Sequence, residues 1–128
     1  MIIQGRSIAK GTGTGPLLIT DTPISLLGGV DPKTGIVIDG SHPLFGKSIA
    51  GKVLVFPYGK GSTVGSYVLY ALAKNRVAPA AIINIECETI IATGAIISEI
   101  PTVDRLNGDL PTNGVVTVDG TRGTVSFA

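Results

Sequence analysis

The short segment Gly59–Thr63, with the sequence GKGST, combines residue types that can hold an anion or react with a substrate. Gly59 and Gly61 allow a backbone to come close to a ligand, and Lys60 between them carries a positive charge. Apolar residues then recur at helical spacing, so Ser62 stands where a helix is expected to begin. A serine at this place can cap the helix, hold an anion with the free N–H groups of the first turn, or react.

Two familiar phosphate-binding motifs do not fit this segment. A G-x-x-x-x-G-K-[S/T] loop would need glycine at Leu54, and a G-x-G-x-x-G fingerprint would need glycine at Val64. Helix capping is the commonest role of a serine at such a position. The glycines, the lysine and the helix N-terminus nevertheless predict a site for an anion, or for an oxygen that becomes one. Its candidate substrate-binding residues are Gly59, Lys60, Gly61 and Thr63.

The surrounding elements predict a mixed α/β domain that covers residues 1–128. A helix is expected over Ser62–Asn75, because its apolar residues lie on one face and Pro79 prevents its continuation. We read Ile90–Pro101 as a second, short helix and Gly114–Phe127 as a hairpin that turns at Asp119-Gly120. Further strands are expected in Ile2–Lys10, Pro16–Thr20, Ile36–Asp39, Lys52–Phe56 and Ala80–Glu86.

Composition restricts the class of partner. Of the 128 residues, 44% are apolar and only 15% are charged, so part of the apolar surface is expected to face another protein. A net charge of +1 and the absence of Trp argue against nucleic-acid binding. The single cysteine suits a reducing compartment, and by itself it cannot hold zinc or an iron–sulfur cluster. With no apolar run of membrane length and no signal peptide, a cytoplasmic protein is expected.

Five other side chains could contribute to a site. His42 could make a local hydrogen bond in its loop or support the active loop. Glu86 and Glu88 could form a general-base pair or lie in solvent at a strand end. Arg105 could meet an anionic substrate or a partner, or remain on the surface. Cys87 is expected to be a small, buried apolar residue.

The segments GGVDPKTGIVID, HPLFGKSIAGKVLVFPYGKGSTVGSYVLYAL and GAIISEIPTVD resemble the small subunits of the aconitase X group. The resemblance covers nearly the whole chain, and the middle segment is its most specific part. It implies the swivelling β/β/α domain of aconitase as a separate chain. It also implies a heterodimer, in which the large subunit carries a [4Fe-4S] cluster and this chain binds no metal.

The resemblance also implies a reaction. It places the proton acceptor of a hydro-lyase on Ser62, with (R)-5-phosphomevalonate losing water to give trans-anhydromevalonate 5-phosphate in an archaeal mevalonate route to isoprenoids. Bacterial relatives suggest an alternative substrate, cis-3-hydroxyproline. A second alternative is a non-catalytic module that binds phosphate and docks on a partner, and a third is a purely structural homo-oligomer.

Overall fold

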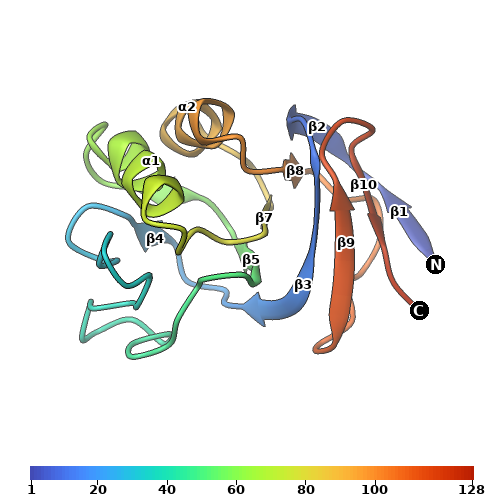
Figure 1. The fold of residues 1–128 in the computed structure, drawn as a ribbon. Coiled ribbons are helices and arrows are strands. Elements are labelled where there is room, and N and C mark those ends of the chain that lie inside the picture. The colour runs from blue at the N-terminus through green and yellow to red at the C-terminus, as the bar shows by residue number, and fades with distance from the viewer.

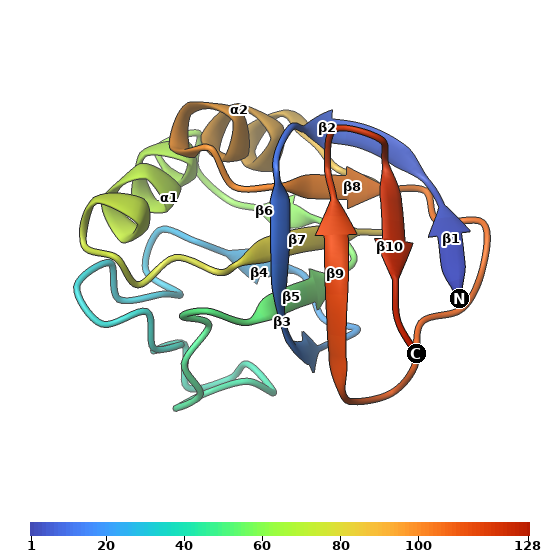
Figure 2. The ribbon, with the colours of Figure 1, turned by 45° about the vertical axis from the view of Figure 1, so that its right-hand side comes forward.

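The protein, described from Met1 to Ala128 by a computed structural model, has two β-layers and one helical layer (Figures 1 and 2). An eight-stranded sheet runs in the order β1-β10-β9-β3-β5-β7-β8-β2 and bends over, so that its two halves lie one above the other. The first half contains β1 (Ile2–Gln4), β10 (Thr124–Ser126), β9 (Val115–Asp119) and β3 (Thr12–Ile19). The second half contains β5 (Val53–Phe56), β7 (Ala81–Asn84), β8 (Thr102–Asp104) and β2 (Arg6–Ala9).

The third layer consists of two helices, α1 (Gly65–Lys74) and α2 (Thr89–Ser98), which cover the outer face of the second half-sheet (Figure 1). A separate pair of short parallel strands, β4 (Ile24–Ser25) and β6 (Gly59–Lys60), lies next to them. No helix of this fold combines the length and the apolar character that crossing a membrane requires.

Strand β5 separates two hydrophobic cores, and its residues alternate between them. Val53 belongs to the core between the two β-layers, whereas Leu54 and Phe56 belong to the core under the helices. The same alternation on β7 sends Ile82 to the helices and Ile83 to the other β-layer. Because both faces are covered, these strands are continuous apolar runs in the sequence.

Parallel pairing places the start of both helices at one edge of the sheet. Strands β5, β7 and β8 pair in parallel, with α1 in the first connection and α2 in the second. Each helix therefore begins just after the carboxyl end of a strand, which is the edge where open α/β sheets bind ligands. The segment Gly59–Thr63 lies at this edge, between β5 and α1.

Several sequence predictions are confirmed. The strands expected in Lys52–Phe56 and Ala80–Glu86 are β5 and β7, and the short helix expected in Ile90–Pro101 is α2. The hairpin in Gly114–Phe127 is β9 and β10, although its connection is longer than two residues, because Asp119 pairs with Thr124.

Other predictions were wrong in detail. Ile2–Lys10 forms two strands, because the chain bends at Gly5 and passes from one half-sheet to the other. Ile36–Asp39 makes only isolated bridges, Val30 with Val37 and Ile36 with Ser48. The strand expected at Pro16–Thr20 is part of the longer β3. Its glycines at 13 and 15 lie against the Ala80 and Gly51 carbonyl oxygens, where a Cβ would collide with the backbone.

Candidate active site

Ser62 lies exposed in the turn that precedes α1, and its hydroxyl is held by the backbone. Ser62 Oγ accepts a hydrogen bond from the Val64 N–H at 3.1 Å, and the Ser62 carbonyl accepts one from the Gly65 N–H at 2.9 Å. The helix expected to begin at Ser62 begins at Gly65, because the turn of residues 62–64 uses tighter i→i+3 bonds. The N-cap is Val64 and not Ser62, although the Ser62 hydroxyl satisfies one N–H of the turn.

The two helices differ at their N-termini. The side chain of Glu88 caps α2 by accepting hydrogen bonds from the Ile90 N–H at 2.7 Å and the Ile91 N–H at 2.9 Å. No side chain caps α1 in this way, and no group of the chain accepts from the N–H groups of Ser62 and Thr63. A helix N-terminus attracts anions through its free N–H groups and its dipole. The positive end of α1 is thus open to a ligand, whereas that of α2 carries a carboxylate of its own chain.

Both glycines of the segment are required by close packing. A Cβ on Gly59 would lie 2.5 Å from Ile91 Cγ1 and 2.7 Å from Glu88 Oε1, so this residue is wedged against the start of α2. Gly61 has φ +93°, and a Cβ on it would lie 2.5 Å from Ser25 Oγ. Strand β6 also pairs with β4, which aligns Lys60 with Ser25. The segment before Ser62 is therefore fixed from two sides.

Lys60 is exposed and close enough to Asp39 to affect its ionisation. The hydroxyl and the N–H of Ser41 donate to the Asp39 carboxylate at 2.7 and 3.0 Å. These bonds hold the pKa of Asp39 below its usual value, and the positive charge of Lys60 acts in the same direction. The ammonium group makes no ion pair within 4.0 Å, so it is available to an anionic ligand.

His42 makes the local hydrogen bond expected of a loop histidine. It is buried, and its Nδ1 accepts from the Leu44 N–H at 3.0 Å. Nδ1 is therefore unprotonated, and the neutral ring carries its hydrogen on Nε2, which has no partner in the chain. No hydrogen bond joins His42 to Ser62, and no side chain is hydrogen-bonded to the serine hydroxyl.

The two glutamates do not form a carboxylate pair. Glu86 accepts from Arg105 Nε at 2.9 Å and from Nη2 at 2.8 Å, and this bidentate contact holds the pKa of Glu86 below its usual value. Glu88 caps α2 instead. Arg6 lies between Glu86 and the buried Asp104 and binds both. The general-base pair suggested by the sequence is thus contradicted, and Arg105 serves an ion-pair network on the surface.

The chemistry of Cys87 matches its expected role. The residue is half-buried against the core under the helices, and burial raises the pKa of its thiol to about 12. A thiol with this pKa is neither a ready nucleophile nor a ready metal ligand. No group of three or more His, Cys, Asp or Glu side chains could hold a metal ion.

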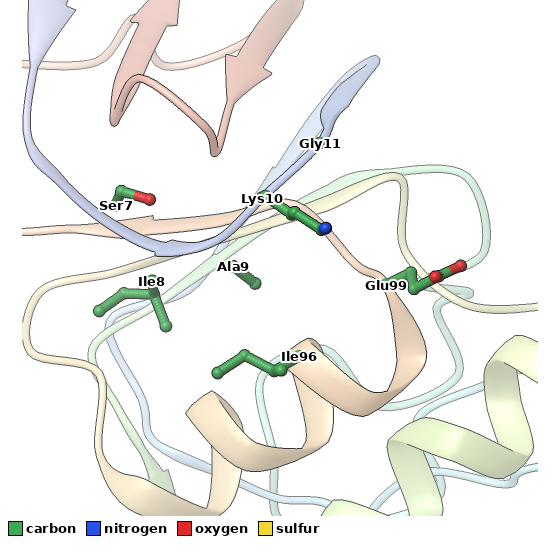
Figure 3. Close-up of a pocket in the computed structure, with 7 residues that line it drawn as sticks. All are labelled: Ser7, Ile8, Ala9, Lys10, Gly11, Ile96 and Glu99. Carbon is green, nitrogen blue, oxygen red and sulfur yellow. The ribbon is translucent and has the colours of Figure 1, made fainter.

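Neither cavity of the chain includes Ser62. The larger cavity, about 600 Å³, lies between β2 and α2, where Ile8 and Ile96 face the same gap (Figure 3). It is lined by none of the predicted site residues. The smaller cavity, about 230 Å³, lies at the carboxyl ends of β5 and β7 beside Asn84 and Arg105. Ser62 therefore stands on an open surface, where a second molecule can complete a site around it.

Two residues beside the serine segment were not predicted. Ser25 packs against Gly61, and no local signal distinguishes it from other serines. Asn84 is buried at the end of β7 and donates to the Phe56 carbonyl at the end of β5. A polar residue that ends the apolar run AAII is a signal that could have indicated it.

Comparison with known proteins shows which family this fold belongs to. The profile of the family described as "Aconitase X swivel domain" matches residues 2–127. The "Phosphomevalonate dehydratase small subunit" of Methanosarcina mazei is 59% identical over 97% of this chain and 89% of that protein. The protein of the same name from Methanocella arvoryzae is 55% identical over the whole of both chains. A crystal structure titled "Thermococcus kodakaraensis aconitase X (holo-form)" superposes with a TM-score of 0.92 at 56% identity, covering 98% of this chain and 96% of that one.

Proposed function

The chain belongs to the aconitase X swivel-domain family, and on this premise we propose that it is the small subunit of a phosphomevalonate dehydratase. In the archaeal mevalonate pathway this enzyme would remove water from (R)-5-phosphomevalonate and give trans-anhydromevalonate 5-phosphate. The names of the relatives support the activity, and the words "small subunit" support a heterodimer with a large subunit. Residues 1–128 would act as one swivel-type domain of that complex.

Ser62 would be the proton acceptor. Dehydration beside a carboxylate requires that a weakly acidic C–H proton leave the carbon between the carboxylate and the carbinol carbon, while the hydroxyl group departs from the latter. A serine oxygen can accept this proton only if its anionic form is stabilised. The Val64 N–H already donates to Ser62 Oγ at 3.1 Å, and the oxygen lies at the positive end of α1. This contact is the observation on which the proposal mainly rests.

The anionic groups of the substrate would meet the same segment. The N–H groups of Ser62 and Thr63 have no acceptor in the chain, and Lys60 adds an unpaired positive charge two residues away. Gly61 is exposed and carries no side chain that would hinder the approach of a carboxylate or phosphate. We assign substrate binding to Lys60, Gly61 and Thr63 on these grounds, whereas Gly59, which is buried against the start of α2, would hold the segment in place.

The iron–sulfur cluster implied by the family does not fit this chain. Such clusters are held by several thiolates, and Cys87 is the single cysteine, with its pKa raised to about 12. We therefore assign the cluster to the large subunit. The part of this chain is to hold the serine oxygen and the surrounding N–H groups toward the substrate.

The face around Ser62 is suited to a protein partner. Tyr67 on α1 is 69% exposed and Phe45 is 58% exposed, which is unusual for large apolar side chains. Further exposed apolar residues lie on the serine segment, at the start of α1 and on the neighbouring loops: Leu27, Ile38, Tyr58 and Val64. A large subunit seated on this face would bury these side chains and enclose the serine.

The decisive experiment replaces Ser62 by alanine in the co-expressed complex. We expect turnover of phosphomevalonate to fall by about a hundredfold to ten-thousandfold, the range that a proton-transfer residue contributes, while the two subunits still co-purify. Ser48→Ala is a matched control, because Ser48 Oγ accepts from the Ala50 N–H in the same local geometry at 3.2 Å. Ser48 lies near the C-terminal end of α1, because the neighbouring Ile49 N–H donates to the Gly35 carbonyl and Gly35 packs against Val77. Loss of the Ser48 hydroxyl should therefore leave turnover unchanged.

Other outcomes would lead to other functions. Near-normal turnover in the Ser62→Ala complex would remove the serine from catalysis and favour a module that only binds phosphate and docks. Turnover of cis-3-hydroxyproline in place of phosphomevalonate would retain the chemistry and change the substrate.

A further inference from the structure

Asn84 is a polar residue at the end of an otherwise apolar strand. All four residues of β7 are buried, and Asn84 is only 2% exposed. A buried amide is unfavourable unless its polar atoms find partners. The position of this side chain therefore calls for a reason beyond the packing of the core.

The amide group of Asn84 is directed at the end of the neighbouring strand. Its Nδ2 donates to the Phe56 carbonyl at 3.0 Å and lies 3.4 Å from the Ile83 carbonyl. Both neighbours are acceptors, so the NH₂ group, and not the oxygen, must face them. Phe56 is the last residue of β5, immediately before the segment that leads to Ser62.

The hydrogen bonds between the strands change register at this point. In a parallel ladder a carbonyl accepts from the residue that follows its partner, as Val55, the partner of Ile19, accepts from the Thr20 N–H at 2.9 Å. By the same rule Phe56, the partner of Asn84, would accept from the N–H of the residue at 85.

That N–H is used elsewhere. The Ile85 N–H donates to the Pro57 carbonyl at 3.0 Å, and the Glu86 N–H donates to the same carbonyl at 3.2 Å. The Asn84 side chain thus supplies the hydrogen bond that the Phe56 carbonyl would otherwise lose. Together these bonds fix the direction in which the chain leaves β5.

We propose that Asn84 is a positioning residue for Ser62, an inference that rests on the proposed function. Its amide closes the end of the β5–β7 ladder and so fixes the start of the segment Pro57–Thr63. The middle of that segment is held by β4 and by the start of α2. Asn84 restrains the start of the segment through the Phe56 carbonyl, and Phe56 lies six residues before Ser62.

Stability alone does not account for an asparagine here. Asn84 Oδ1 is buried and has no hydrogen-bond partner in the chain, which is unfavourable. Leucine has a similar shape, would fill the same space and would leave no unpaired oxygen. What leucine cannot do is donate to the Phe56 carbonyl. The side chain therefore serves the path of the backbone more than the packing of the core.

The test compares Asn84→Leu and Asn84→Ala with Asn75→Ala in the assembled complex. Asn75 is the matched control, because its Nδ2 donates to the distant Pro32 carbonyl at 2.8 Å, near the C-terminal end of α1. A displacement of about 1 Å at a reacting group can cost about a hundredfold in rate. We expect kcat to fall by about this factor in both Asn84 variants, while KM changes much less, and to stay unchanged in Asn75→Ala.

Amide hydrogen exchange of this chain supplies a readout that does not depend on activity. The amides of Val64 and Gly65 should exchange faster in the Asn84 variants, whereas those of β9 and β10 should keep their wild-type rates. A normal kcat in Asn84→Leu, with Ser62→Ala inactive, would overturn the positioning role and leave the proposed function standing. A lower kcat with unchanged exchange at Val64 would also overturn it. An active Ser62→Ala complex would instead contradict the proposed function itself.

Discussion

Gly61→Ala should change the position of Ser62 more than any other replacement of a glycine by alanine in the exposed loops. Gly61 immediately precedes Ser62, and its φ of +93° lies in the region that side chains disfavour. The new Cβ would also lie 2.5 Å from Ser25 Oγ, closer than real Cβ contacts permit. Two separate costs therefore act at one position.

Both costs can be given a magnitude. A non-glycine residue with positive φ costs about 1–2 kcal/mol. Rotating the Ser25 hydroxyl away would break its hydrogen bond to the Leu27 carbonyl at 3.3 Å, which costs about 0.5–1.5 kcal/mol. The free energy of unfolding should therefore fall by roughly 1.5–3.5 kcal/mol, which lowers Tm by roughly 5–15 °C for a chain of this size. Because Ser62 follows directly, kcat of the complex should fall by about a hundredfold.

Two companion variants separate the costs. Gly114 has φ +97° but no atom within 4 Å of its ideal Cβ, so Gly114→Ala carries the backbone strain alone. It should lose about 1–2 kcal/mol and keep its full turnover. In the double variant Gly61→Ala with Ser25→Ala, the contact with Oγ is removed, and the steric part of the loss should be recovered.

The assays are urea unfolding of this chain and steady-state turnover of the complex. The reasoning would be refuted if Gly61→Ala were no less stable than Gly114→Ala. It would equally be refuted if Gly61→Ala kept wild-type kcat, because the position of Ser62 would then not depend on the conformation of Gly61.

Three further predictions concern the ion pair, the helix cap and the exposed face. Burial alone would raise the pKa of Asp104, but hydrogen bonds from Arg6 at 2.7 Å and from the Cys87 N–H hold it below its usual value. The contribution of Asp104 to the free energy of unfolding is therefore complete above the pKa of about 4 that an aspartate has in the unfolded chain, and it is lost as pH falls through the lower pKa of the folded state. In Arg6→Gln this loss should occur at higher pH, which urea unfolding at a series of pH values would detect. Glu88→Ala should lower the free energy of unfolding by about 1 kcal/mol, because α2 loses the cap on two N–H groups, and a thermal melt compared with Glu99→Ala, at the other end of α2, would detect it. Tyr67→Asp should weaken co-purification with the large subunit, whereas Val115→Asp should not, although Val115 on β9 is 60% exposed against 69% for Tyr67.

The sequence predicted those elements whose pattern depends on local chemistry. The strands β5 and β7 are short, β-branched and flanked by turn residues, and the helix after Ser62 has a clear apolar face. The extent of β3 could not be predicted in this way. Its glycines are typical of a loop in the sequence, but in the fold they permit contact with the backbone of the other layer.

The candidate site was predictable only in part, for a similar reason. Gly59, Gly61 and Ser62 are adjacent in sequence, so their joint role could be inferred from local spacing. Gly61 packs against Ser25, which lies 36 residues earlier in the chain, and the Phe56 carbonyl accepts from Asn84, which lies 28 residues later. Nothing in a single sequence records such pairings.

The contrast between the two helices explains why the reactive residue should be Ser62, at the start of α1, and should not lie at the start of α2, where Glu88 stands. Both helices start at the same edge of the sheet, and each could in principle attract an anion there. At α2 the Glu88 carboxylate already accepts from two N–H groups, and it would repel a second anion. At α1 the corresponding place holds a serine hydroxyl, whose deprotonated form would be stabilised by the Val64 N–H and could then accept the proton of the substrate. Ser62→Asp would place a carboxylate at the start of α1, as Glu88 does at α2. Binding of phosphomevalonate to the complex should therefore be abolished, while the fold remains intact.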